Sequence, residues 1–156
     1  MSKEARDFAI SAHGGQLYGS EPYRSHLFSV VQILRDYGFR GKWEEAGWLH
    51  DTIEDTQITL EDLRGRFGDW VAQVVWAVSG VGHNRKTRNA SIYSKLANNH
   101  DSRIVKVADR IANVENSKAG SSHRAMYLKE RDEFEAAARE GVPGLMWERL
   151  ERAYMA

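Results

Sequence analysis

The stretch AGWLHDTIEDT, residues 46–56, places two residues that commonly bind metals at the end of an apolar segment. The apolar face of this segment repeats at intervals of three and four residues and contains Trp43, Ala46, Gly47 and His50. This spacing predicts a helix over about 42–50. His50 completes the apolar face and Asp51 follows it directly. Taken alone, such a pair is either hydrogen-bonded in the core or part of a metal site.

Length, charge and composition exclude several functional classes. The chain has 156 residues, 22 basic and 22 acidic side chains, and therefore a net charge of zero, which argues against a nucleic-acid partner. It contains no cysteine, which excludes disulfides, thiolate zinc sites and a cysteine nucleophile. No run of apolar residues reaches the ~18 needed for a membrane span, and no export signal precedes the first helix. We therefore expect a cytoplasmic protein without a membrane partner; the oligomeric state stays open.

The hydrophobic pattern predicts an all-α bundle of about eight or nine helices that forms one domain over 1–156. After a first helix that includes Ala12, further helices are expected at about 22–37, 42–50, 60–67, 70–78, 91–99, 102–117, 123–139 and 145–154. Pro22 suits the first turn of the second helix. Thr59 and Asp62 form a capping box, and Gly68 ends that helix. Residues 80–89 are predicted to form a loop. This loop is either simply solvated or steers phosphates with three basic side chains, Arg85, Lys86 and Arg88.

Two further residues of the metal-ligand type interrupt apolar helix faces. His26 shares a face with Val30 and Ile33, and Asp109 lies between apolar neighbours on its own helix. Each residue alone has an ordinary explanation as a core histidine or a buried ion pair. Together with His50 and Asp51 they follow the order H…HD…D on three predicted helices. Two imidazoles and two carboxylates suit Mn²⁺, Fe²⁺, Zn²⁺ or Mg²⁺.

Several segments of the chain resemble the HD phosphohydrolase superfamily, and specifically the hydrolase domain of RelA/SpoT homologues and the small alarmone hydrolases. The resemblance is strongest over about 5–117. The segments are AHGGQ from Ala12, EPY from Glu21 leading to His26, AGWLHDTIEDT from Ala46, FGDWV from Phe67, VSG from Val78, and KVADRIANV from Lys106. Because long members of the family carry synthetase and regulatory domains after the hydrolase, we expect a hydrolase domain only.

The resemblance implies an all-helical HD domain that uses Mn²⁺ to remove the 3′-pyrophosphate from guanosine tetra- or pentaphosphate, the stringent-response alarmones. It also implies a role for each matching residue. The metal ligands would be His26, His50, Asp51 and Asp109. Glu54 and Asp55 match the acidic pair that orients or activates water, and Lys106 and Asn113 match residues on the helix that faces the substrate.

Spacing along the helices agrees with these roles. If the helix continues through Asp51, Glu54 lies four residues after His50 and both acids sit one turn beyond the ligands. Surface acids at that helix end would oppose the helix dipole, which disfavours a purely structural explanation. Lys106, Arg110 and Asn113 fall on the same helix face as Asp109, as expected for one wall of a cleft.

The chain departs from the family most clearly in the segment between Gln16 and Glu21. Many members carry there a basic pair that frames the guanine, and this chain lacks it. Base recognition is therefore expected to depend on stacking by Tyr18 or Arg24, or to be relaxed. Two alternatives stay open: hydrolysis of another phosphorylated nucleotide, such as a nicotinamide dinucleotide phosphate, and a catalytically weak module that senses nucleotides.

Overall fold

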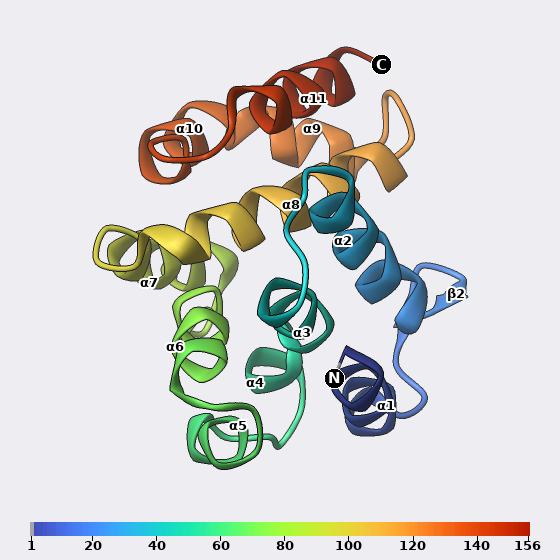
Figure 1. Ribbon diagram of the computed structural model, residues 1–156. Coiled ribbons are helices and arrows are strands. Elements are labelled where there is room, and N and C mark those ends of the chain that lie inside the picture. The colour runs from blue at the N-terminus through green and yellow to red at the C-terminus, as the bar shows by residue number, and fades with distance from the viewer. Residues whose placement is uncertain (1) are drawn as a thin grey trace.

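The computed structural model describes residues 2–156 and consists of helices with one short hairpin (Figure 1). In chain order the elements are α1 (Ser2–His13), β1 (Leu17–Tyr18), β2 (Glu21–Pro22), α2 (Arg24–Asp36), α3 (Lys42–Leu49), α4 (Thr52–Asp55), α5 (Leu60–Phe67), α6 (Asp69–Ala77), α7 (Arg85–Leu96), α8 (His100–Asn116), α9 (Ser122–Lys129), α10 (Arg131–Ala138) and α11 (Gly144–Met155). The prediction of an all-α bundle is confirmed.

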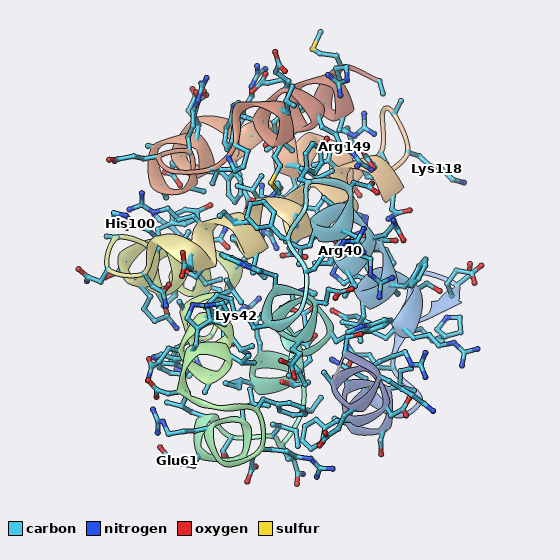
Figure 2. All side chains as sticks on the ribbon, in the orientation of Figure 1. Arg40, Lys42, Glu61, His100, Lys118 and Arg149 are labelled. Atoms are coloured by element: carbon cyan, nitrogen blue, oxygen red, sulfur yellow. The ribbon has the colours of Figure 1, made fainter. Side chains whose placement is uncertain are left out.

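Helix α8 forms the centre of the fold and crosses the middle of the molecule (Figure 1). It contacts α2, α3, α6, α7, α10 and α11. Nearly every residue from Ser102 to Ala112 is buried, because apolar side chains occur on several faces of this helix. Helices α9–α11 cover one side of α8, whereas α3–α6 lie on the other. Charged side chains such as Glu61 and Lys118 project from the surface (Figure 2).

Two apolar clusters hold these layers together. The larger one joins α8 to α2, α10 and α11 around fully buried side chains such as Phe134 and Leu150. The second joins α1, α2, α3, α5 and α6 around Leu27 and Leu63. Gly47 allows α2 and α3 to approach closely, because an added Cβ would lie 2.9 Å from Leu34 Cδ1. The packing of these helices places the first turn of α2 beside the end of α3.

The predicted helix boundaries hold at α5 and fail at several other helices. The box formed by Thr59 and Asp62 begins α5, and Gly68, at φ 90°, ends it, as predicted. The number of helices was underestimated, because 42–55 and 122–138 each contain two helices and not one. Residues 85–89 were wrongly assigned to a loop. Asn84 caps α7 by accepting a hydrogen bond from the Thr87 N–H, so the helix already begins at Arg85.

The placement of Pro22 in the second helix was also wrong. Pro22 pairs with Leu17, and Tyr18 pairs with Glu21, in an antiparallel hairpin. Gly19 takes φ 61° in the two-residue turn, which explains why a glycine is needed there. The helix starts only at Arg24. Tyr18 of the hairpin reaches α8, and Tyr23, which directly follows the hairpin, reaches α4.

Over residues 2–156, none of the helices combines the length and the apolar character that crossing a bilayer requires.

Candidate metal centre and its cavity

The chain breaks its helical path at His50 and Asp51, between α3 and α4. His50 Nδ1 lies 2.7 Å from the Gly47 carbonyl oxygen, and the Thr52 hydroxyl donates to the Leu49 carbonyl at 2.7 Å. The His50 and Thr52 side chains thus pair with backbone carbonyls near the end of α3. Adjacent side chains on a regular helix diverge by about 100°, so the break permits His50 and Asp51 to reach the same point. The helix therefore does not continue through Asp51, which was the condition for placing Glu54 and Asp55 one helical turn beyond the ligands.

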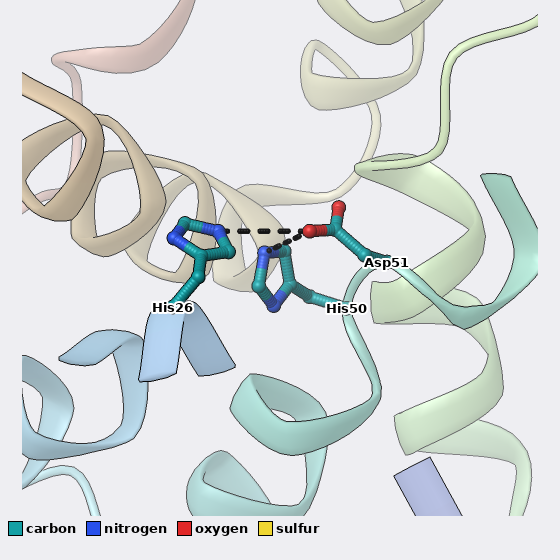
Figure 3. A group of neighbouring side chains, drawn as sticks. All are labelled: His26, His50 and Asp51. Carbon is teal, nitrogen blue, oxygen red and sulfur yellow. Dashed lines mark ion pairs between the residues drawn. The ribbon is translucent and has the colours of Figure 1, made fainter. Parts of the chain in front are cut away.

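Four side chains from α2, the α3–α4 break and α8 converge there (Figure 3 shows three of them). His26 Nε2 lies 3.0 Å from Asp109 Oδ1 and 3.6 Å from Asp51 Oδ2. His50 Nε2 lies 3.0 Å from Asp51 Oδ2 and 3.3 Å from Asp109 Oδ1. All four residues are buried, and the ligand atoms of His26, His50 and Asp51 lie within 4.8 Å of one another. The sequence thus predicted which residues meet.

The donor chemistry fits a divalent metal ion. His50 Nε2 is buried and makes no hydrogen bond of good geometry among residues 2–156, although two carboxylate oxygens lie close to it. Burial opposes protonation of His50, but the charges of Asp51 and Asp109 outweigh this effect and raise its pKa well above the ordinary value. A metal ion satisfies the same carboxylates while leaving the imidazole neutral. The Gly47 carbonyl beside Nδ1 fixes the ring with Nε2 facing the centre.

Lys106, Asn113 and Tyr18 surround Asp109. Lys106 Nζ donates to Asp109 Oδ2 at 2.9 Å, and Asn113 Nδ2 donates to Oδ1 at 3.2 Å. The Tyr18 hydroxyl donates to Asn113 Oδ1 at 2.8 Å, and the Tyr18 ring stacks on His26 with centroids 4.7 Å apart. The hairpin is thereby tied to α8 and to a ligand. Tyr18 was predicted only to stack on a base. In the structure its ring stacks on His26, one of the predicted metal ligands.

Tyr23 links the other ligand to the acidic pair. Its hydroxyl lies 2.5 Å from Asp51 Oδ2 and 3.1 Å from Asp55 Oδ2, so its single proton is shared between the two carboxylates. Gln16 Nε2 also donates to Asp55 at 3.3 Å, and His13 stacks on Tyr23 at 4.6 Å. No role for Tyr23 was predicted from the sequence. Its position three residues before His26 was the available signal, because i and i+3 share a helix face.

Glu54 faces the same cavity and is held by the backbone of Gly80. Glu54 Oε1 accepts a hydrogen bond from the Gly80 N–H at 2.6 Å. Burial, together with the nearby charge of Asp51, raises the pKa of Glu54 and likewise that of Asp55. A carboxylate with a raised pKa is a better proton acceptor near neutral pH. Both acids therefore have the protonation properties expected of groups that handle a water proton.

The position of Gly80 yields a prediction. A Cβ at Gly80 would lie 2.6 Å from Glu54 Oε1 and 2.6 Å from Arg88 Cβ, so Gly80→Ala must displace the Glu54 carboxylate. Since a shift of about 1 Å in a catalytic group can cost 10²-fold, we expect turnover to fall by roughly 10- to 100-fold. Gly65→Ala is the control, because its Cβ would meet nothing within 4 Å. Equal turnover in both variants would contradict a role for the Gly80 contact.

A cavity of about 470 Å³ opens over the metal centre, a size within the range of small-molecule sites. It is lined by Tyr23, His26, Asp51, Glu54, Asp55, Gly80, Gly82, Arg85, Arg88, Asn89, Ile92, Lys106, Asp109, Arg110 and Asn113. Of the predicted substrate contacts, Arg24 and Lys86 are exposed and lie outside this lining within residues 2–156. Tyr18 instead lines a neighbouring cavity of about 390 Å³ that shares Asn113.

The basic residues of α7 differ in how far they are available to a ligand. Arg85 is engaged by Glu130 through two hydrogen bonds of 2.6 and 2.9 Å. Within residues 2–156, the Arg88 guanidinium makes one long hydrogen bond, of 3.5 Å, to the Gly82 carbonyl. Asn89 was not predicted from the sequence, because its place on the wall depends on how α7 packs against α8. Arg110, predicted to share the helix face of Asp109, also lines this wall. Arg85 is thus held in place on the cavity wall, whereas Arg88 on the same wall can still adjust to a ligand phosphate.

The helical fold and the His-Asp cluster define an all-α protein with a divalent metal site. Residues 5–134 match the HD domain family, and the chain belongs to this family. The match extends beyond the 5–117 over which the resemblance was strongest.

Comparisons with known proteins give relatives named as guanosine-3′,5′-bis(diphosphate) 3′-pyrophosphohydrolases and others named as GTP pyrophosphokinases. The chain is 37% identical over 118 residues to the guanosine-3′,5′-bis(diphosphate) 3′-pyrophosphohydrolase of Aquifex aeolicus, covering 72% of this chain and 17% of that protein. It is 38% identical over 115 residues to the enzyme of the same name from Vibrio cholerae, covering 68% and 16%. The chain thus spans about a sixth of these relatives. A metazoan SpoT ortholog described as hydrolysing ppGpp has the same fold, with TM-score 0.83, 20% identity and coverage of 99% and 93%.

Proposed function

We propose that this chain is a metal-dependent hydrolase that removes the 3′-pyrophosphate from guanosine tetra- or pentaphosphate and releases GDP or GTP and pyrophosphate. The main support is the convergence of His26, His50, Asp51 and Asp109 beneath a cavity whose wall also carries Glu54. The names of the Aquifex aeolicus and Vibrio cholerae relatives specify the hydrolysis of such a nucleotide. The proposal includes a cytoplasmic location and a small-molecule partner, as expected from the sequence.

The four converging residues would hold the metal, for which we propose Mn²⁺ among the ions that suit two imidazoles and two carboxylates. When bound, such an ion supplies Lewis-acid polarisation of a phosphoryl oxygen and lowers the pKa of a water molecule. The His50 ring is oriented for this role by the Gly47 carbonyl, and Asp109 is held by Lys106 and Asn113. These contacts preorganise the ligands before the substrate arrives.

Glu54 is proposed as the group that accepts the proton of the attacking water, with Asp55 orienting that water. In the reaction the water oxygen bonds to phosphorus, the bond from phosphorus to the 3′-oxygen breaks, and the 3′-oxygen leaves with a proton. Gly80 fixes the Glu54 carboxylate, whereas Tyr23 and Gln16 fix Asp55. Lys106 and Arg88 line the same wall and would neutralise phosphate charge. No covalent intermediate is required.

The base is proposed to lie toward the second cavity, beside Tyr18 and Asn113. Arg24 is exposed and lines neither this cavity nor the central one within residues 2–156, so the proposal that it stacks on the base finds no support there. The Tyr18 ring is already stacked on His26 and its hydroxyl is bonded to Asn113. A base beside this ring gains affinity mainly by stacking, which distinguishes poorly between bases.

We therefore predict that the 3′-pyrophosphate is required more strictly than the guanine. The measurement compares kcat/KM for guanosine and adenosine nucleotides that carry the same 3′-pyrophosphate. We expect a guanosine preference below about 100-fold, or ~2.7 kcal/mol of transition-state discrimination. A guanosine nucleotide without 3′-phosphates serves as the control and should not be turned over. A preference well above this limit would show that other residues read the guanine.

Because this chain lacks the basic pair between Gln16 and Glu21, a second candidate substrate class is another phosphorylated nucleotide, such as a nicotinamide dinucleotide phosphate. A nucleotide-sensing module is disfavoured, because binding alone does not require four metal ligands together with Glu54 and Asp55. A turnover screen of the purified protein with Mn²⁺ against a nucleotide panel, the alarmones included, tests the proposal. Fastest turnover of an alarmone supports it, whereas faster turnover of another nucleotide replaces the substrate.

A further inference from the structure

Glu130 lies where α9 ends and α10 begins, and its carboxylate gathers donors from two other helices. Arg85 donates to it through Nε at 2.6 Å and through Nη2 at 2.9 Å. Asn89 Nδ2 donates at 3.2 Å, and Arg110 Nη1 lies 3.2 Å from the other oxygen. One carboxylate thus engages the first turns of α7 and the middle of α8.

The three partners of Glu130 all line the cavity over the metal centre, whereas Glu130 is not part of that lining within residues 2–156. The carboxylate therefore contacts these donors without forming part of the cavity wall itself. Its backbone is fixed on both sides, because its N–H donates to the Met126 carbonyl and its carbonyl accepts from the Phe134 N–H. The bend between α9 and α10 gives Glu130 a rigid base from which to hold the wall.

Arg110 shows why the wall needs a counter-charge. It is only 2% exposed, and its guanidinium lies over the rings of Phe134 at 4.3 Å and Tyr127 at 5.1 Å. A buried cation without a partner is strongly destabilising. Arg110 Nη1 makes no hydrogen bond of good geometry among the described residues, although Glu130 lies near it. Glu130 therefore supplies the negative charge that balances this buried guanidinium.

We propose that Glu130 is a positioning residue for the substrate's phosphates, which holds Arg85, Asn89 and Arg110 in the orientation that an anionic ligand meets. The proposal rests on the proposed function, since it takes a nucleotide phosphate as the ligand. Donors fixed in advance bind an anion without first losing side-chain freedom. Because Glu130 lies outside the cavity lining within residues 2–156, it should affect binding and leave the chemical step nearly unchanged.

The test compares Glu130→Gln with Glu115→Gln in the Mn²⁺-loaded protein. Glu115 is a matched control, because Arg149 donates to it through Nε at 2.8 Å and Nη2 at 3.0 Å, between α8 and α11 and away from the cavity lining. Arg149 is labelled in Figure 2. Substrate kinetics and calorimetric binding of inorganic pyrophosphate are both measured. Since a tenfold loss corresponds to one charge-assisted bond, we expect E130Q to raise KM and weaken pyrophosphate binding about tenfold, with kcat within about threefold.

Each outcome decides the proposal. E130Q with unchanged or tighter pyrophosphate binding overturns it, as does a loss equal to that of E115Q. A fall in kcat at constant KM also overturns it. If E130Q does not fold, Glu130→Asp keeps the charge on a shorter side chain and should show a smaller loss of the same kind; unchanged binding there overturns the proposal too. Pyrophosphate binding is measured without turnover. If the wild-type protein binds pyrophosphate but hydrolyses no alarmone, the proposed function is refuted and the role of Glu130 is still tested.

Discussion

Exhaustive chelation is expected to abolish turnover and to lower the Tm of this protein by roughly 5–10 °C, and Mn²⁺ is expected to restore both. A metal present at about 100 times its Kd stabilises a protein by ~2.7 kcal/mol, and ~1 kcal/mol shifts the Tm of a chain of this size by about 2–4 °C. The physical origin is the cluster itself, in which the Asp51 and Asp109 carboxylates are crowded around two buried imidazoles.

Asp109→Asn tests the same site by changing a predicted metal ligand, whereas chelation removes the metal. The substitution preserves size but removes the charge from an oxygen that lies 3.0 Å from His26 Nε2 and 3.3 Å from His50 Nε2. If a metal supplies ~4 kcal/mol of charge stabilisation, its loss lowers kcat/KM by about 10³-fold. The Tm of this variant should also stop responding to chelation. Asp7→Asn, which alters an exposed carboxylate paired with Arg6, should behave like the wild type in both assays.

Turnover and Tm that survive chelation unchanged would exclude the metal site. Loss of activity in Asp109→Asn with a normal metal content would instead indicate that Asp109 orients Lys106 or Asn113, to which it is hydrogen-bonded, and does not bind the ion. Measuring metal content with activity therefore separates the two roles.

The features that the sequence predicted are those that local chemistry determines. Thr59, Asp62 and Gly68 define both ends of α5, because capping and a positive φ act within a few residues. The four donors could be identified because a polar residue on an apolar helix face must have a buried partner. The order H…HD…D suggested that they share a site, the resemblance to HD phosphohydrolases implied that they are metal ligands, and the structure brings the four together.

The features that the sequence did not reveal depend on contacts between distant segments. The break after α3 requires the His50 and Thr52 side chains to occupy backbone carbonyls, which helical periodicity does not report. The bend at Glu130 likewise accompanies contacts to Arg85, 45 residues away. Apolar spacing over 123–139 is compatible with one helix or two, so the pattern favoured the simpler one. The role of Tyr23 and the contact between Arg110 and Glu130 required knowing which helices pack together.

Glu54→Gln is expected to lower kcat by roughly 10²–10⁴-fold while leaving metal content and Tm unchanged, since general-base assistance accounts for an effect of that size. The amide oxygen of glutamine can still accept the hydrogen bond that Gly80 N–H donates to Glu54 Oε1, so the side chain should stay in place. What the variant loses is the basicity and the charge. Glu61→Gln, which alters an exposed acid on α5, is the control and should keep full activity.

Asp55→Asn distinguishes the two acids. The Asp55 carboxylate accepts hydrogen bonds from Tyr23 at 3.1 Å and Gln16 at 3.3 Å, and it is thereby more restrained by side chains than Glu54. A residue restrained in this way suits orientation of the water, whereas Glu54 faces the cavity with a single backbone contact and a pKa raised by burial. We therefore expect the larger loss of kcat in Glu54→Gln. A native rate in that variant, with a large loss in Asp55→Asn, would transfer the role of proton acceptor to Asp55, because both carboxylates line the same cavity beside Asp51.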